Sequence, residues 1–182
     1  MTRYRYFTAA SLDGFLADED DSLAWLLVQD HDEDGPGSHG AFMAGIGAMV
    51  MGATTYAWIG EHLRTSGEAW DYEVPCFVFT HRDLEPLGEQ VTLVQGTPAE
   101  HRAAIEEAAG ARDVWMVGGG ALAADFAEAG MLDDVLVSIA PVTLGSGRPL
   151  FPRRFALRLT DLGRNGGFAV ATYDVVGPPT QW

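Results

Sequence analysis

The sequence contains no lysine. All 11 basic residues are arginine, against 26 acidic residues, and the formal net charge is −15. The absence of lysine excludes a lysine Schiff base, a lysine general base and the lysine of a Walker phosphate-binding loop. A strongly acidic chain without a basic stripe also repels nucleic acid and anionic membrane surfaces, so we expect neither as a partner.

Cysteine and long apolar runs are scarce too. The single Cys76 excludes an internal disulfide and a zinc site built from several thiolates. No apolar run approaches the ~20 residues of a membrane-spanning helix. The first residues, MTRYRYFTAASLDG, lack the apolar core of a signal peptide. We therefore expect a cytoplasmic protein with no membrane partner.

Motifs for metal binding and for hydrolysis are incomplete. The D-x-D-x-D-G pattern of residues 30–35 matches the first half of a calcium-binding loop, but the twelfth position, which should be a bidentate Glu, is Ala41. The five histidines show no HExxH spacing. Ser146 in LGSGR lacks the G-x-S-x-G frame of a nucleophile elbow. We predict no metal site, and we interpret the acidic stretch as a solvated loop.

Strand-like and helix-like segments alternate along the 182 residues. A capping box, TPAE, starts a helix at Thr97 that Gly110 ends, and the sequence NGG at 165–167 indicates a tight turn between two final strands. We expect helices over 22–28, 53–63, 98–110 and 122–129, and strands over 3–10, 48–51, 75–80, 91–94, 114–117, 135–140, 158–162 and 168–176. This order predicts a single α/β domain, 1–182, with a mostly parallel central sheet and a C-terminal antiparallel hairpin.

The stretch VWMVGGGALA at 114–123 contains Gly118-x-Gly120-x-x-Ala123, the spacing of a dinucleotide-binding fingerprint. A Rossmann fold is not supported, because that fingerprint opens its domain and is followed by a strand and then an acid. A glycine turn before a helix still presents free backbone N–H groups that suit a phosphate. The alternative is a tight turn that needs glycine only for positive φ.

Two other strand ends carry groups that suit anions. Thr80-His81-Arg82 follows a buried strand, and Gly52-Ala53-Thr54-Thr55 joins a strand to a helix start. Each has a plain structural alternative, a solvent-facing strand end and a helix N-cap. Because ligands gather at the carboxyl ends of strands in α/β sheets, the three segments together favour one extended, multiply charged cofactor.

With these segments, the chain resembles the dihydrofolate reductase-like superfamily, and within it the branch related to the reductase domain of the bifunctional riboflavin-biosynthesis deaminase/reductase. The resemblance rests on TAASLDGFLA, VMGATTYAW, FVFTHR and VWMVGGGALAADFAEAGMLDDVLVSIAPVTLGSGRPLF, with a C-terminal hairpin. These stretches cover nearly the whole chain in the family's order. The resemblance implies a three-layer fold, a sheet of eight to nine strands and a site for NADPH.

The resemblance also implies roles for named residues. The pyrophosphate would lie on Gly118, Gly119 and Gly120 with the N–H groups of Ala121 and Leu122. Its phosphates would be held from the other side by Gly52, Ala53, Thr54 and Thr55. The adenosine 2′-phosphate would lie at Thr80, His81 and Arg82, and the nicotinamide beside Ala10, Leu16 and Ala17.

Several positions depart from the family pattern. Phe15 stands where the riboflavin reductases carry Lys or Arg, Val117 where they carry Glu, and Ala53 where the superfamily often has Arg. The acid that anchors the pterin in dihydrofolate reductases has only the candidates Asp30, Asp32 and Glu33, outside a clear helix. These departures leave NADPH better supported than either family substrate.

We therefore expect an NADPH-dependent reductase that passes hydride to a small, flat, pterin-like or pyrimidine-like substrate. Asp13 is a candidate polar group at the substrate, or else a turn-forming Asp before Gly14. Phe15, Trp25 and Trp58 are candidate apolar walls, or else core residues. The alternative function is a nucleotide-binding regulatory or sensor module that has lost catalysis. A homodimer is expected if the apolar segment VLVSIAPV lies near a sheet edge.

Overall fold

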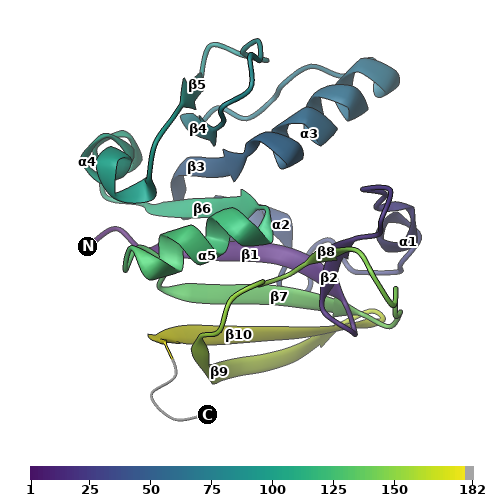
Figure 1. Ribbon diagram of the computed structural model, residues 1–182. Helices are drawn as coiled ribbons and strands as arrows, with labels where there is room; N and C mark the ends of the chain where they lie inside the picture. Colours follow the sequence, from purple (N-terminus) through teal and green to yellow (C-terminus); the bar gives the residue numbers. More distant parts are fainter. Residues whose placement is uncertain (179–182) are drawn as a thin grey trace.

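The computed structural model describes residues 1–178, and eight of its strands form one twisted sheet (Figure 1). The strand order is β5-β4-β3-β6-β1-β7-β10-β9. The strands are β1 (Tyr4–Ser11), β3 (Ile46–Gly52), β4 (Cys76–Phe79), β5 (Val91–Val94), β6 (Asp113–Gly118), β7 (Asp134–Ala140), β9 (Ala156–Asn165) and β10 (Phe168–Gly177). The first six are mutually parallel, and β10 is antiparallel to both β7 and β9. The predicted α/β class, the mostly parallel sheet and the closing hairpin are confirmed.

Helices cover both faces of this sheet. They are α1 (Ala24–Leu27), α2 (His39–Met43), α3 (Ala53–Ser66), α4 (Pro98–Ala109) and α5 (Gly120–Glu128). Two elements were not predicted, the short helix α2 and a small antiparallel ribbon of β2 (Phe15–Ala17) and β8 (Arg148–Pro149). Within residues 1–178, no helix has both the length and the apolar character needed to cross a bilayer.

The apolar strands explain the layered arrangement. A parallel strand is buried on both faces, and the first six residues of β3, IGAMVM, are all buried. On one face Tyr6 packs in a core with Ile105 of α4 and Phe126 of α5. On the other face Phe42 of α2 and Tyr56 of α3 share a second core with other sheet residues. The sheet is thus the middle of three layers.

The parallel strands give the sheet two chemically different edges. The carboxyl ends of β1, β3, β4, β6 and β7 lie at the right-hand side of Figure 1. At the opposite, amino edge, the buried Asp134 carboxylate contacts Arg3 and Arg5, each at 3.0 Å. These two arginines neutralise a buried carboxylate, so they are not free to hold an anionic ligand.

A homodimer was expected on the condition that the apolar segment VLVSIAPV lies near a sheet edge, and the structure does not meet this condition. β7 contains the apolar segment but lies between β1 and β10, so it offers no free edge. The outer strand on this side is β9, where Leu157, Leu159 and Leu162 are exposed. A homodimer therefore stays a prediction, to be tested by light scattering against the 19.6 kDa mass of the chain.

Candidate functional site

Two helix N-termini meet at the carboxyl edge of the sheet. β3 and β6 are neighbours, and each leads directly into a helix, α3 after Gly52 and α5 after Gly119. The hydroxyl of Thr55 in α3 lies 3.3 Å from the place that a Cβ on Gly118 would take. Neither helix has a side-chain cap on its first N–H groups. The two positive dipole ends therefore face the same side of the molecule without a partner of their own.

Helix α4 shows the contrasting case. Its first turn is closed by the predicted capping box, in which the Glu100 carboxylate accepts hydrogen bonds from the Thr97 backbone N–H at 2.6 Å and the Thr97 hydroxyl at 2.8 Å. A carboxylate already occupies this N-terminus, so it repels a phosphate. Among the three longer helices, the open N-termini are thus those of α3 and α5, the pair that the sequence predicted.

The three consecutive glycines differ in backbone conformation and in the space available for a side chain. Gly118 has a φ of +156°, and a Cβ on Gly120 would overlap the carbonyl oxygens of Pro149 and Leu150. Gly119 has an ordinary φ of −83°, and the nearest atom to its added Cβ would be 4.0 Å away. The alternative of a tight turn at positive φ therefore does not account for Gly119. Its missing side chain leaves open space beside the two helix N-termini.

The segment after β4 presents a free guanidinium. The Thr80 hydroxyl accepts a hydrogen bond from the Arg82 backbone N–H at 2.9 Å and is buried, whereas His81 and Arg82 are exposed. Within residues 1–178, six arginines form ion pairs, namely 3, 5, 64, 148, 153 and 158, and two more donate to backbone carbonyls, 102 and 164. The remaining Arg112 and Arg154 precede β6 and β9, at the amino edge. Arg82 is the uncommitted arginine at the carboxyl edge.

The residues expected at the nicotinamide are brought to the same edge. Ala10 is 1% exposed and its side chain lies in the core, so only its backbone can face a ligand. Leu16 and Ala17 lie in β2, which pairs with β8. Pro149 at the end of β8 and the next residue, Leu150, pack on Gly120. The β2–β8 ribbon thus lies beside the Gly118–Gly120 turn.

Asp13 holds a turn. Its carboxylate accepts hydrogen bonds from the Ser11 hydroxyl at 2.6 Å and from the backbone N–H groups of Leu144 and Gly145, the latter at 2.7 Å. These donors stabilise the charged form and lower the pKa of Asp13 to about 2, with the Ser11 hydroxyl as the largest cause. Such a carboxylate is a poor proton donor. The contacts favour the turn-forming interpretation over a catalytic one.

A pH dependence follows from this lowered pKa. Because the folded-state pKa lies below the ordinary 3.8, Asp13 stabilises the fold above about pH 4, and this contribution is lost as the pH falls towards 2. We expect Asp13→Asn to unfold at lower urea concentration than the wild type near pH 6, and the two proteins to converge near pH 2. Urea denaturation at both pH values measures this. If the wild type and Asp13→Asn differ as much in urea stability near pH 2 as near pH 6, ionised Asp13 does not stabilise the fold in this way.

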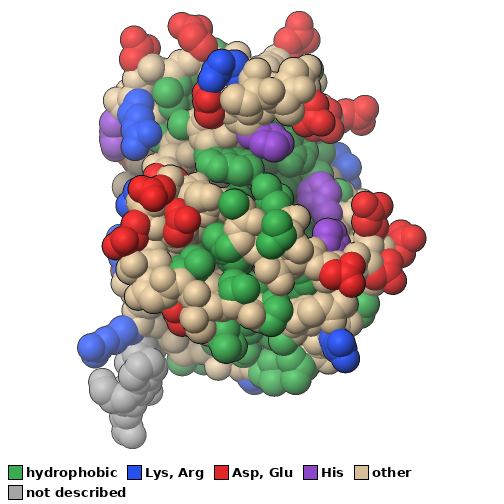
Figure 2. All heavy atoms as spheres, turned by 90° about the vertical axis from the view of Figure 1, so that its right-hand side faces the viewer, with side chains coloured by type: hydrophobic (Ala, Val, Ile, Leu, Met, Phe, Trp, Pro, Cys, Tyr) green, Lys and Arg blue, Asp and Glu red, His purple; other side chains and the backbone are tan. Residues whose placement is uncertain are grey.

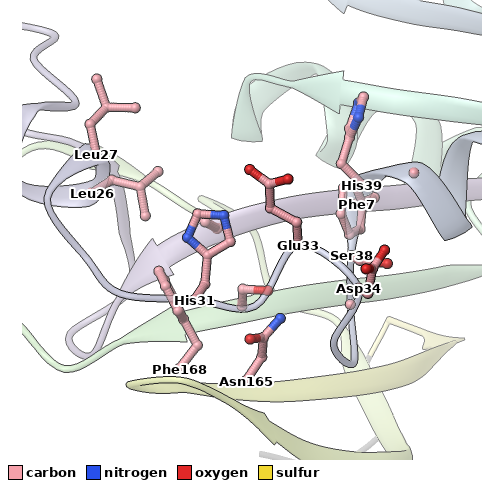
Figure 3. A pocket seen from close by; sticks show the side chains of 14 residues that line it. Phe7, Leu26, Leu27, His31, Glu33, Asp34, Ser38, His39, Asn165 and Phe168 are labelled. Carbon is pink, nitrogen blue, oxygen red and sulfur yellow. The ribbon is translucent and has the colours of Figure 1, made fainter.

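A cavity of about 630 Å³ lies beside this edge, on the α2/α3 face of the sheet (Figure 3). This volume falls within the ~300–1,000 Å³ of small-molecule sites. Its floor is made by side chains of three adjacent strands: Phe7 and Ala9 of β1, Ser138 of β7 and Phe168 of β10. The rest of the lining comes from α1 and from the acidic loop with the start of α2: Leu26, Leu27, His31, Glu33, Asp34, Gly37, Ser38, His39 and Gly40, with Asn165 beside them.

The acidic residues of the loop are exposed to solvent, as predicted, and the loop is also attached to the rest of the protein. The Asn165 side chain accepts a hydrogen bond from the Asp32 N–H at 2.7 Å and donates to the carbonyls of Asp32 and Pro36 at 2.9 and 3.1 Å. The loop also packs so closely on the predicted β9–β10 turn that a Cβ on Gly166 would overlap the Asp30 carbonyl. Asn165 therefore positions the loop over the sheet.

The three aromatic residues predicted as pocket walls do not line this cavity. Trp58 stacks on His62 with ring centroids 5.2 Å apart, and the Trp25 indole N–H donates to the Ser22 carbonyl at 3.2 Å. Phe15 borders a separate shallow depression with Glu19 and Arg148. Of the three candidate acids, Glu33 lines the cavity, whereas Asp30 and Asp32 do not.

Sequence reasoning missed the residues that do form the walls. Period-2 alternation in β1 would have placed Phe7 and Ala9 on one face, opposite the buried Tyr6 and Ala10. His39 is exposed, its ring lies 5.3 Å from that of Trp115, and partial desolvation lowers its pKa. Nothing in the local sequence indicates that Ser138 and Phe168 meet the acidic loop.

Viewed from the carboxyl edge, this face of the molecule is apolar in the middle and acidic at its rim (Figure 2). Within residues 1–178, no group of three or more His, Cys, Asp and Glu side chains is arranged to hold a metal ion. The site thus has two adjacent parts. The carboxyl edge of the sheet carries two open helix N-termini and one free arginine. The cavity beside it is lined by aromatic, imidazole and carboxylate side chains. Such a site can hold a phosphate-bearing molecule along the edge and a second, smaller molecule beside it.

Comparisons with known proteins give a consistent picture. Residues 4–164 match the family model described as RibD C-terminal domain. The uncharacterized protein YwjB of Bacillus subtilis is 30% identical over 146 residues, which cover 80% of each chain. A structure from Shewanella sp. PV-4, provisionally named a riboflavin biosynthesis protein, has a TM-score of 0.79 at 24% identity and covers 96% of this chain and 99% of its own. A Thermotoga maritima deaminase/5-amino-6-(5-phosphoribosylamino)uracil reductase has a TM-score of 0.62 at 14% identity over 96% and 56% of the two chains.

Proposed function

The chain belongs to the family of RibD C-terminal domains, and from this membership and the geometry of its carboxyl edge we propose that it is an NADPH-dependent reductase of a small heterocyclic molecule. The observation that carries the proposal is the pairing of two uncapped helix N-termini, at α3 and α5, with the free Arg82 along the same edge. Unpaired backbone N–H groups at a helix N-terminus bind phosphates in many proteins, and so does an arginine guanidinium.

The residues present fit NADPH. The open space at Gly119, unlike that at Gly120, is not filled by the protein itself, and the Thr55 hydroxyl borders it. In this proposal Gly52–Thr55 and Gly118–Leu122 hold the pyrophosphate, and Thr80, His81 and Arg82 hold the 2′-phosphate. Leu16, Ala17 and the Ala10 backbone flank the nicotinamide. NADPH, when bound, supplies the hydride.

The chain's own residues orient the substrate. Phe7 is fixed by stacking on Phe42 with centroids 4.3 Å apart, and His31 lies edge-on to Phe168. These aromatic walls offer an apolar surface to a flat ring. The cavity also holds the His31 and His39 imidazoles and the Glu33 carboxylate, side chains of the kind that take part in proton transfer. Their presence favours a reductase over a sensor that only binds the nucleotide.

The test is a titration of NADPH followed by turnover. We expect saturable NADPH binding by calorimetry, and loss of absorbance at 340 nm when pterins, pyrimidines or small carbonyl compounds are added. NADPH binding without turnover of any compound would favour the sensor module. Absence of NADPH binding would overturn the proposal. The cytoplasmic location stays a prediction.

A further inference from the structure

We infer that β9 is the contact surface for a second copy of this chain, with the two β9 strands paired antiparallel about a two-fold axis. β9 is the last strand in the sheet order, and within residues 1–178 no strand pairs with its outer side (Figure 1). The backbone N–H and C=O groups on that side can therefore pair with another strand. This contact is independent of the proposed function, because it uses the outer strand and not the carboxyl edge of the sheet.

The two outer strands of the sheet differ in how much they offer to another chain. β5, at the opposite side of the sheet, has only four residues, and a short outer strand gives a partner little to pair with. β9 has ten residues and no proline, and its residues 157–162 are all exposed. β9 is thus the outer strand that is open to pairing.

A β-bulge brings three exposed leucines to one face of β9. In a regular strand Leu159 and Leu162 would point to opposite faces, because side chains alternate and the two are three residues apart. Thr160 has no partner in the register with β10, and this extra residue shifts the alternation. The three leucines, Leu157, Leu159 and Leu162, consequently pair with alternate residues of β10 that share one face, Val175, Tyr173 and Ala171.

The leucine row, Leu157, Leu159 and Leu162, is 42%, 50% and 65% exposed. It lies on the face of the sheet where Ala171 is in the core with Ile105 of α4 and Phe126 of α5. Large apolar side chains gathered in one exposed row are typical of an interaction surface.

The charges of the β9–β10 hairpin do not oppose self-association, although the chain has a net charge of −15. Residues 156–177 contain two arginines and two aspartates, so their net charge is zero: Arg158, Arg164, Asp161 and Asp174. Arg158 and Asp174 form an ion pair at 2.7 Å within the hairpin. Two copies that meet here therefore avoid the repulsion that opposes contact between acidic surfaces.

The order of the charges along β9 is self-complementary. With the two-fold axis beside Thr160, antiparallel pairing places Arg158 opposite Asp161 of the second copy. Directly opposite residues must project from the same face, and the bulge meets this requirement, since Arg158 and Asp161 pair with the alternate residues Asp174 and Thr172 of β10. The symmetry repeats the pair, so that one contact contains two arginine–aspartate pairs.

The same register also joins the two leucine rows. It places Leu157 opposite Leu162 of the second copy, again on one face. Cross-strand pairs of apolar side chains and of opposite charges both stabilise antiparallel strands. The register that matches the charges is thus also the one that matches the apolar side chains, and this agreement favours a second copy as the occupant.

Light scattering during size-exclusion chromatography of the full chain tests the contact. We expect a mass of twice 19.6 kDa at micromolar concentrations. Leu162→Asp should weaken the dimer by about tenfold or more, because it places a carboxylate in the leucine row. The control is Leu12→Asp, at a leucine of similar exposure outside the hairpin, 68%, which should dimerise as the wild type does. A wild type that is monomeric at all micromolar concentrations, or a folded Leu162→Asp that dimerises as tightly as the wild type, would overturn the inference.

A charge exchange tests the register. Arg158→Asp alone and Asp161→Arg alone each set like charges opposite one another, and each should weaken the dimer. The double variant restores opposite charges and should dimerise more tightly than either single variant. Thermal unfolding followed by circular dichroism checks that each variant is folded, since Arg158 also contacts Asp174 within the chain. A folded double variant that dimerises no more tightly than the single variants, or an unweakened Asp161→Arg, shows that this register is wrong.

The competing occupant of the leucine row is the chain's own segment 179–182. It follows the end of β10, where Gly177 pairs with Ala156 of β9. Removal of residues 179–182 from the full chain should leave the dimer as tight as in the wild type. If the wild type is a monomer and the shortened chain is a dimer, the segment covers the row in the wild type and the inference is wrong.

Discussion

Replacing Gly119 by valine should weaken NADPH binding by about 10- to 100-fold, or about 1.4–2.7 kcal/mol, while the fold survives. Gly119 has a φ of −83°, and apart from its chain neighbours the nearest atom to an added Cβ is the Thr55 hydroxyl oxygen at 4.0 Å, so the folded protein has room for a side chain there. It would instead occupy the space beside the N-termini of α3 and α5. Fluorescence or calorimetric titration of NADPH, together with thermal unfolding, measures both quantities.

The neighbouring glycine supplies the matched control. Gly120→Ala should lower the unfolding temperature, because its Cβ would overlap the Pro149 and Leu150 carbonyls. Gly119→Ala should be as stable as the wild type and show an intermediate loss of NADPH affinity. If folded Gly119→Val binds NADPH as the wild type does, the phosphate role of this turn is wrong.

Arg82→Ala should remove most of the preference for NADPH over NADH. The two cofactors differ by the 2′-phosphate, and a charge-assisted arginine–phosphate contact contributes roughly 1.5–3 kcal/mol. The wild type should therefore prefer NADPH by about 10- to 100-fold. The net charge of −15 repels the polyanionic cofactor at long range, so a local cation is needed to offset it. Titration of both cofactors against both proteins gives the ratio.

Arg112→Ala is the control for this substitution. Arg112 is likewise exposed and lacks an ion pair within residues 1–178, but it precedes β6 at the amino edge. Its removal changes the net charge by the same amount and should leave the NADPH/NADH ratio unaltered. Equal affinity of the wild type for NADH and NADPH, or an unaltered ratio in Arg82→Ala, would show that Arg82 does not bind the 2′-phosphate.

Much of the proposed cofactor site at the carboxyl edge could be predicted from the sequence, because its signals are local. A strand that ends in glycine and leads into a helix is visible in GATTYAW and in VGGGALA, and parallel strands bring such ends to one edge. The β2–β8 ribbon and α2 escaped prediction because they are two to five residues long. Segments this short carry too little periodicity to stand out.

The substrate side could not be predicted in the same way. The large aromatic residues Phe15, Trp25 and Trp58 do not line the cavity on the α2/α3 face, since size and hydrophobicity do not distinguish a lining residue from a packed one. The attachment of the acidic loop was not predicted, because it depends on Asn165, which is 133 residues beyond Asp32 in the chain. Likewise the position of β7 inside the sheet depends on which strands pair with it.

The sequence by itself determined the fold class, the presence of residues that suit an anion at three strand ends and the absence of lysine chemistry. Each of these follows from residue types and spacing within a few turns of chain. Only the tertiary structure decided that Gly119 is the glycine left open, that Arg82 is the uncommitted arginine of the carboxyl edge, and that Glu33, His31 and His39 share a cavity with Phe168. These properties depend on contacts between residues far apart in the chain, and such contacts are set by packing and pairing rather than by local preference.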